Sequence, residues 1–164
     1  MKNILCLLFT LPCLLFSEPA VILDNPALLS FTDHLPHEGL LKQTPEGFLY
    51  IELPKEYVFS LLPLIPNPPS PPPYFSDGKI GAHITVASAQ EIEKLGRPSI
   101  PHLGESIPFT ILSFAYVRLE KCSMGSEIYL LEVEAPMIEE IRTSLGLPLT
   151  MIPDGKYHIT IGVK

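Results

Sequence analysis

The amino-acid sequence predicts one α+β domain over residues 47–164. Stretches in which apolar and polar side chains alternate, as in a β-strand, are interleaved there with stretches of helical periodicity. Two of the predicted strands, 108–119 and 127–134, flank the short turn sequence KCSMGS and should pair across it. A phrase is also nearly repeated, as DGKIGAHIT at 77–85 and DGKYHIT at 154–160, and both copies lie on predicted strands.

The first twenty residues have the layout of a signal peptide. A short basic start precedes an apolar run at 4–16, and residues 17–20 become small and polar. The apolar run is too short to span a bilayer. We therefore expect residues 1–20 to direct export, to the periplasm or out of the cell, and to be the only contact with a membrane. The mature chain should begin between Glu18 and Val21.

The rest of the chain is acidic and poor in cysteine. The 164 residues carry a formal net charge of −7, and Cys122 is the only cysteine beyond the signal peptide. We therefore expect no internal disulfide and one domain that folds on its hydrophobic core, as a monomer. A long nucleic-acid footprint needs a basic face, so the charge argues against one. A short nucleotide held in one pocket remains compatible with it.

Residues 21–46 show no clear period and contain three prolines, so we expect an irregular lead-in. His34 and His37 lie there as HLPH. They are expected to be solvated, because no cysteine or further histidine is near enough in the sequence to complete a metal site.

The alternation in GFLYIEL, residues 47–53, predicts the first strand of the domain. Successive side chains of a strand point to opposite faces. One face should therefore carry Leu49, Ile51 and Leu53 against the helices. The other face should carry Phe48, Tyr50 and Glu52.

A helix is predicted to begin at Pro54, where the missing N–H group has no cost, and to tighten or end at Pro63. Residues 66–79 follow as a proline-rich connector that contains NPPSPPPY. We interpret this stretch as a stiff surface connection to the next strand. The alternative is a ligand for a groove-type recognition domain.

The remaining sequence predicts two more helices among four strands. Ser88 and Glu91 are spaced as a capping box, and Pro136 and Gly146 bracket the last helix. The expected elements are a strand at 80–87, a helix at 88–95, a loop at 97–107, strands at 108–119 and 127–134, a helix at 136–145 and a strand at 157–163. The apolar side chains expected to face inward from the last helix are Met137, Ile138, Ile141 and Leu145.

The repeated phrase places one imidazole and one hydroxyl on the same face of each strand. Residues i and i+2 of a strand share a face, so His83 lies beside Thr85, and His158 lies beside Thr160. The apolar residues between them point to the opposite side. Two strands that each present this pair predict a shared groove in which both pairs converge.

Such a set of side chains suits phosphoryl transfer. One imidazole can take a proton from water while the other donates a proton to the leaving oxygen. The hydroxyls, with Lys79 or Lys156, could hold the non-bridging oxygens of the phosphate, and Tyr50 could stack on a base or pack against a sugar. Two histidines could alternatively bind zinc, but no third ligand accompanies either of them in the sequence.

Paired H-x-T strands resemble those of the two-histidine (2H) phosphoesterase superfamily, and in particular its RNA-repair-like Swiss Army Knife group. The resemblance runs from Gly47 to Lys164 and includes the sequences IELPKEYV, AHITV and YHITIG. It implies a duplicated, two-lobed fold with antiparallel sheets lining a central groove and helices outside. It also implies that the two histidines are acid and base, that the two threonines hold the phosphate, and that neither metal nor cofactor is needed.

The expected function is therefore a metal-independent phosphodiesterase. The resemblance implies a 2′,3′-cyclic phosphate or a related phosphodiester at a nucleotide or RNA end as substrate. Two alternatives remain open from the sequence. One is a secreted module that binds a nucleotide or phosphate without turnover. The other is a host-facing interaction protein that acts through its proline-rich stretch.

Overall fold

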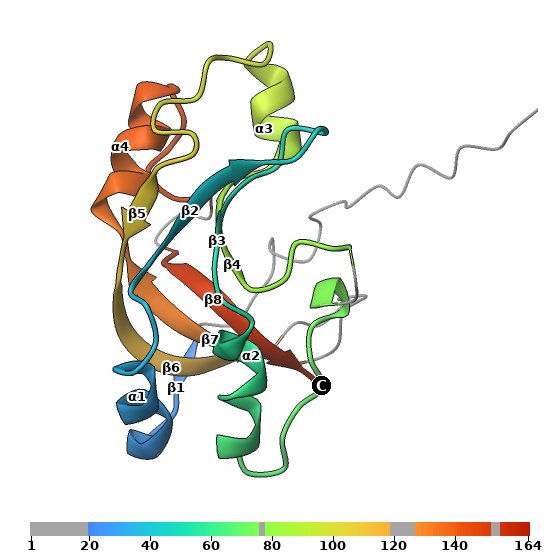
Figure 1. The fold of residues 1–164 in the computed structure, drawn as a ribbon, viewed down its shortest axis with the longest axis vertical. Helices are drawn as coiled ribbons and strands as arrows, with labels where there is room; N and C mark the ends of the chain where they lie inside the picture. Colours follow the sequence, from blue (N-terminus) through green and yellow to red (C-terminus); the bar gives the residue numbers. More distant parts are fainter. Residues whose placement is uncertain (1–19, 76–77, 119–126, 152–154) are drawn as a thin grey trace, which may run out of the picture.

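The computed structural model describes residues 20–75, 78–118, 127–151 and 155–164 (Figure 1). Residues 1–19 of the predicted signal peptide, Cys122, Asp77 and Asp154 lie outside these ranges. The helices are α1 (Pro26–Thr32), α2 (Glu56–Phe59), α3 (Ala89–Lys94) and α4 (Pro136–Ser144), with 3₁₀ turns at Leu62–Leu64 and Pro73–Phe75. The strands are β1 (Val21–Ile22), β2 (Glu38–Gln43), β3 (Leu49–Glu52), β4 (His83–Ala87), β5 (Ser106–Pro108), β6 (Thr110–Arg118), β7 (Glu127–Glu134) and β8 (Tyr157–Val163).

All of these strands belong to one antiparallel sheet in the order β1-β6-β7-β8-β4-β3-β2-β5. The sheet curls into a half-barrel, with α1 and α2 near one end and α3 and α4 near the other (Figure 1). Only Phe109 separates β5 from β6, although β5 lies at one edge of the sheet and β6 near the other. The mixed helix and strand composition is thus confirmed, but the described strands form one continuous sheet rather than two separate ones.

The strand and helix predictions for residues 47–164 are confirmed, because every strand and helix predicted there overlaps a described one of the same type. The capping box of α3 is present, with Ser88 Oγ accepting from the Glu91 N–H group at 3.2 Å and Glu91 Oε2 accepting from the Ser88 N–H group at 2.8 Å. The predicted loop at 97–107 contains the start of β5, a strand of three residues that is too short to give a periodic signal. None of the helices in the described part of the chain is long and apolar enough to cross a membrane.

The expectation of an irregular lead-in at 21–46 is wrong. Helix α1 begins after Asn25, whose side chain accepts from the Leu28 N–H group at 3.1 Å, and β2 pairs with both β3 and β5. Periodicity missed α1 because it has only seven residues, and missed β2 because only Leu41 of that strand is fully buried. The sheet therefore begins before residue 47.

The two histidines of HLPH also differ from each other. His34 is exposed, as expected, whereas His37 is half-buried. The His37 ring stacks on Phe109 with a centroid distance of 6.0 Å, and its Nε2 atom lies 3.0 Å from the Thr32 carbonyl oxygen. His37 therefore helps to pack α1 against the sheet.

The apolar core covers one face of the sheet. Leu49, Ile51, Ile84 and Ile159 are fully buried in it, together with apolar side chains of α2 and α4. This is the alternation predicted for β3, β4 and β8. The opposite face of these strands is left for polar side chains.

The proline-rich stretch is docked on the sheet rather than lying free on the surface. Ser70 forms a one-residue bridge with Val163, with hydrogen bonds of 3.0 and 2.9 Å in the two directions. Pro69 packs so closely on Gly162 that a Cβ atom at Gly162 would lie 2.4 Å from the Pro69 Cγ atom. The connector therefore follows the end of β8 and forms part of the fold.

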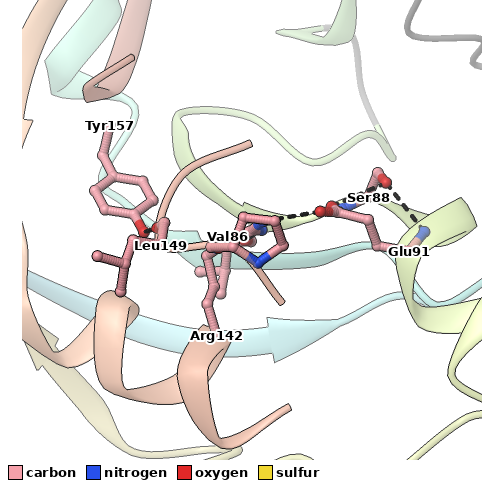
Figure 2. Close-up of polar contacts among 7 residues, drawn as sticks. Val86, Ser88, Glu91, Arg142, Leu149 and Tyr157 are labelled. Atoms are coloured by element: carbon pink, nitrogen blue, oxygen red, sulfur yellow. Dashed lines mark hydrogen bonds and ion pairs between the residues drawn. The ribbon is translucent and has the colours of Figure 1, made fainter. Parts of the chain in front are cut away.

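Helix α4 carries a buried arginine that was not predicted from the sequence (Figure 2). Ile138 and Ile141 face inward as expected, and Met137 and Leu145 pack at the edge of the core. Arg142 is 0% exposed. Its guanidinium donates to the Pro148 carbonyl at 2.6 Å, to the Val86 carbonyl at 2.6 Å and to Glu91 Oε1 at 2.8 Å.

This arginine joins three separate parts of the chain. Val86 belongs to β4, Glu91 is the capping residue of α3, and Pro148 follows α4. Figure 2 shows the side chain extended between these partners, with Tyr157 of β8 bonded to the Leu149 carbonyl beside it. Arg142 thus fixes the end of the strand that carries His83.

Candidate active site

The two histidine-bearing strands are neighbours at the centre of the sheet. Strand β4 pairs antiparallel with β8, and Ile84 is the register partner of Ile159. Continuing this register places His83 across from Thr160, and His158 across from Thr85. Since the isoleucines point into the core, all four of these side chains lie on the opposite face. The structure therefore brings the two predicted pairs together.

Each histidine is anchored in the same way. The Nδ1 atom of His83 lies 2.8 Å from the Gly81 carbonyl oxygen, and His158 hydrogen-bonds to the backbone of Lys156. In both cases the partner is two residues earlier in the chain. A neutral His83 that donates from Nδ1 keeps Nε2 as its free acceptor. Gly81 has a φ of 74°, a conformation that favours glycine, and this turn brings its carbonyl to the ring.

His83 is surrounded by aromatic rings. Its ring centroid lies 4.9 Å from that of Tyr74, 5.8 Å from that of Phe48 and 6.0 Å from that of Tyr50. Burial lowers the pKa of His83 to about 4, with the Gly81 carbonyl acting in the opposite direction and a charge on His158 lowering it further. The aromatic surroundings therefore keep His83 neutral near pH 7.

His158 has a carboxylate beside it. Glu132 of β7 is its register partner, so the two side chains share a face, and Glu132 is only 8% exposed. The Ser113 hydroxyl donates to Glu132 Oε2 at 2.6 Å, and Lys156 Nζ donates to the same oxygen at 2.9 Å. Burial raises the pKa of Glu132, but these two hydrogen bonds, together with the charges of Lys156 and His158, outweigh it and hold the pKa below its ordinary value.

The pKa of His158 is also lowered. Burial is the main cause, and it is opposed by the hydrogen bond to the Lys156 backbone and by the negative charge of Glu132. The two imidazoles therefore have the same backbone anchor but different surroundings. His83 lies in an aromatic enclosure, and His158 lies beside a fixed carboxylate.

A small cavity of about 30 Å³ opens beside this arrangement. It is lined by Thr85, Thr150, Met151, Gly155, Lys156, Tyr157 and His158. The cavity thus lies where β4 and β8 meet and contacts one hydroxyl and one imidazole of the two pairs. Lys156, which lines the cavity, also forms the ion pair with Glu132.

The three residues predicted to bind substrate have different positions. Lys156 lines the cavity. Tyr50 is 8% exposed and its ring packs against both Phe48 and His83, so it forms a wall of the histidine site. Lys79 is exposed, and its Nζ atom donates to the Pro73 carbonyl at 3.5 Å, beside the segment that carries Tyr74. No contact joins Lys79 to His83 or His158 among the described residues.

Two residues of this site, Tyr74 and Glu132, were not predicted from the sequence. Tyr74 contacts both halves of it, because its ring packs on His83 and its side chain hydrogen-bonds to Thr160. Burial raises the pKa of Tyr74 to about 12, so its hydroxyl stays protonated. Two signals were available: an aromatic side chain that ends a stiff proline run, and an acidic residue inside the otherwise apolar strand IYLLEV.

Opening the aromatic enclosure should change the titration of His83. In Tyr74→Ala we expect the pKa of His83 to rise from about 4 toward the ordinary 6.5, because burial is the main cause of the shift. An NMR titration of the histidine ring signals measures this directly. The matched variant Tyr116→Ala, on β6, should leave His83 unchanged. A wild-type His83 that titrates near 6.5 would contradict the assigned surroundings.

No cluster of three or more His, Cys, Asp or Glu side chains suited to a metal ion is found among the residues that the structure describes. Residues 49–164 match a protein-family model described as Swiss Army Knife, 2H phosphoesterase domain. The match covers more than two thirds of the chain and includes both histidine strands. No curated protein and no solved structure matches the chain.

Proposed function

Because this chain belongs to the Swiss Army Knife family of 2H phosphoesterase domains, we propose that it is a metal-independent phosphodiesterase. His83 and His158 act as its acid–base pair. Its substrate is a 2′,3′-cyclic phosphate or a related phosphodiester at a nucleotide or RNA end. The observation that carries this proposal is the meeting of two imidazoles and two hydroxyls on one face of β4 and β8.

The reaction needs one proton removed and one proton supplied. A water oxygen attacks phosphorus as one imidazole takes its proton, and the bond between phosphorus and the leaving oxygen breaks as the other imidazole donates a proton to that oxygen. The product is a phosphomonoester with a free hydroxyl. Acid–base catalysis of this kind contributes about 10²–10⁴-fold in rate. Thr85 and Thr160 donate to the non-bridging oxygens, where negative charge must be held.

The surroundings favour a small substrate. The whole chain carries a formal charge of −7, and Lys156 is the cation that lines the cavity beside His158. A nucleotide-sized phosphodiester needs little more positive charge than this, whereas a long nucleic acid needs a basic track. The pattern of residues 1–20 supports the further proposal that the enzyme acts after export.

A panel assay tests this function. Purified protein should hydrolyse at least one nucleoside 2′,3′-cyclic phosphate or linear dinucleotide, and EDTA should leave the rate unchanged. Loss of activity in EDTA that zinc restores would replace the paired-imidazole reaction with metal catalysis. Binding of these compounds without turnover would identify a binding module instead.

The two hydroxyls should each contribute a moderate part of the rate. Thr85→Ala and Thr160→Ala each remove one hydrogen bond to a charged oxygen, which contributes roughly 1.5–3 kcal/mol, or about ten- to a hundredfold in kcat. Steady-state kinetics on the best cyclic substrate measures the loss. Serine at either position should recover most of it, and Thr110→Ala, an exposed change on β6, should have no effect. Full activity in both alanine variants would remove the threonines from the mechanism.

A further inference from the structure

The two imidazoles are not equivalent, and the difference lies in which groups face each of them. Tyr74, Phe48 and Tyr50 face His83, and a charge on His158 also acts on it. Its register partner on β3 is Glu52, but Lys42 Nζ holds the Glu52 carboxylate at 2.6 Å on the side of β2. Among the residues that the structure describes, His83 therefore packs mainly against aromatic rings, and no carboxylate is directed at it.

His158 has the opposite arrangement. Glu132 faces it from β7, and the charge of this carboxylate acts on the imidazole. Lys156, the remaining charged group near it, is bonded to Glu132 Oε2, and Ser113 donates to the same atom. Both donors use one oxygen of Glu132, which fixes the orientation of the carboxylate. A buried carboxylate fixed in this way favours the protonated form of a neighbouring imidazole.

We propose that Glu132 is a positioning residue that makes His158 the general acid of the reaction, while His83 is the general base. This assignment rests on the proposed phosphodiesterase function. A base must be neutral before the reaction. The aromatic enclosure favours the neutral form of His83. An acid must be protonated. Burial lowers the pKa of His158, and Glu132 and the negative charge of a bound phosphodiester act in the opposite direction and favour the protonated form.

The proton balance follows from these roles. Nε2 of His83 accepts a proton from water as the water oxygen bonds to phosphorus. His158 gives its proton to the leaving alkoxide oxygen as the bond from that oxygen to phosphorus breaks. His83 is left protonated and His158 neutral, and exchange with solvent restores both before the next turnover. No other reactant is required.

A change of leaving group separates the acid from the base. A nucleoside 2′,3′-cyclic phosphate expels an alkoxide that needs a proton, whereas bis(p-nitrophenyl) phosphate expels a phenolate that does not. His158→Ala should lose about a hundredfold or more on the cyclic substrate and less than about tenfold on the aryl diester. His83→Ala should lose about a hundredfold or more on both.

The outcomes distinguish this assignment from the function on which it rests. Wild-type protein that hydrolyses neither substrate overturns the phosphodiesterase function and the assignment with it. Wild-type turnover with the pattern reversed, so that the aryl diester rescues His83→Ala, overturns the assignment alone. Equal losses of His158→Ala on the two substrates overturn it as well.

The role of Glu132 has a separate readout in the pH profile of kcat/KM. The alkaline limb reports loss of the proton of the acid, and the acidic limb reports protonation of the base. Glu132→Gln removes the negative charge, so the alkaline limb should move to lower pH while the acidic limb stays in place. Glu132→Asp should return the alkaline limb to its wild-type pH. Glu134→Gln, an exposed change on the same strand, should leave the limb at that pH. An unmoved alkaline limb in a folded Glu132→Gln variant contradicts the role of Glu132.

Discussion

His83→Ala and His158→Ala should each remove most of the turnover of a cyclic phosphodiester. Each change deletes one of two proton-transfer groups, and such a group contributes about 10²–10⁴-fold in rate. The double variant should be scarcely slower than either single variant, because residues that act as one unit lose their effect together. The kcat values of the four proteins, measured on the same substrate, test both statements.

A surface histidine provides the control for these variants. His102 is exposed and paired with Glu105, and His102→Ala should keep wild-type kcat. Circular dichroism of each variant establishes that the sheet is intact. More than about a tenth of wild-type activity in either His83→Ala or His158→Ala would remove that residue from the acid–base pair.

Among the substitutions proposed for this protein, Arg142→Met should cause the largest loss of stability. It removes all three hydrogen bonds of a fully buried guanidinium and leaves the partly buried carboxylate of Glu91 without its cation. Breaking a buried ion pair from one side destabilises a fold by about 3–5 kcal/mol. Urea unfolding of the two proteins measures the difference. Arg118→Met, which breaks an exposed pair with Glu127, should lose at most about 1 kcal/mol.

The pH dependence of this loss follows from Glu91. Burial raises the pKa of Glu91, but its bonds to Arg142 and Ser88 hold the pKa below the ordinary value. Wild-type stability should therefore fall as the pH drops below that ordinary value, since the unfolded carboxyl binds a proton first. Without Arg142 the stability depends less on pH. The difference in unfolding free energy between wild type and Arg142→Met should therefore become smaller toward acid pH. If the difference in unfolding free energy is the same at pH 7 and pH 4, Glu91 contributes little to the stability that Arg142 provides.

Local patterns in the sequence predicted the parts of the fold that depend on them. Alternation at 47–53, 80–87 and 157–163 located β3, β4 and β8, because each of these strands buries one face completely. The repeated phrase predicted which side chains share a face, and the family match confirms the resemblance drawn from it. What alternation cannot give is the order of strands in a sheet. The adjacency of β4 and β8 and the continuity of the sheet are therefore seen only in the folded structure.

Arg142, Glu132 and Tyr74 were not predicted from the sequence for a different reason. They are polar side chains whose burial depends on partners far away in the sequence, such as Val86 for the arginine and Ser113 for the glutamate. A charged residue in an isolated helix or strand is ordinarily read as solvent-facing. Only the packed structure shows that its hydrogen bonds are satisfied inside.

The proline-rich segment has a consequence for the unfolded chain. Residues 66–73 contain six prolines, and Tyr74 follows directly after them. Proline restricts the backbone before folding as well as after it, and each one in a compatible position stabilises a fold by about 0.4–1 kcal/mol through lost conformational entropy of the unfolded state. Fixing Tyr74 against His83 and Thr160 therefore has a low entropic cost. The wall of the site is ordered before any substrate arrives, so binding energy need not be diverted to ordering it.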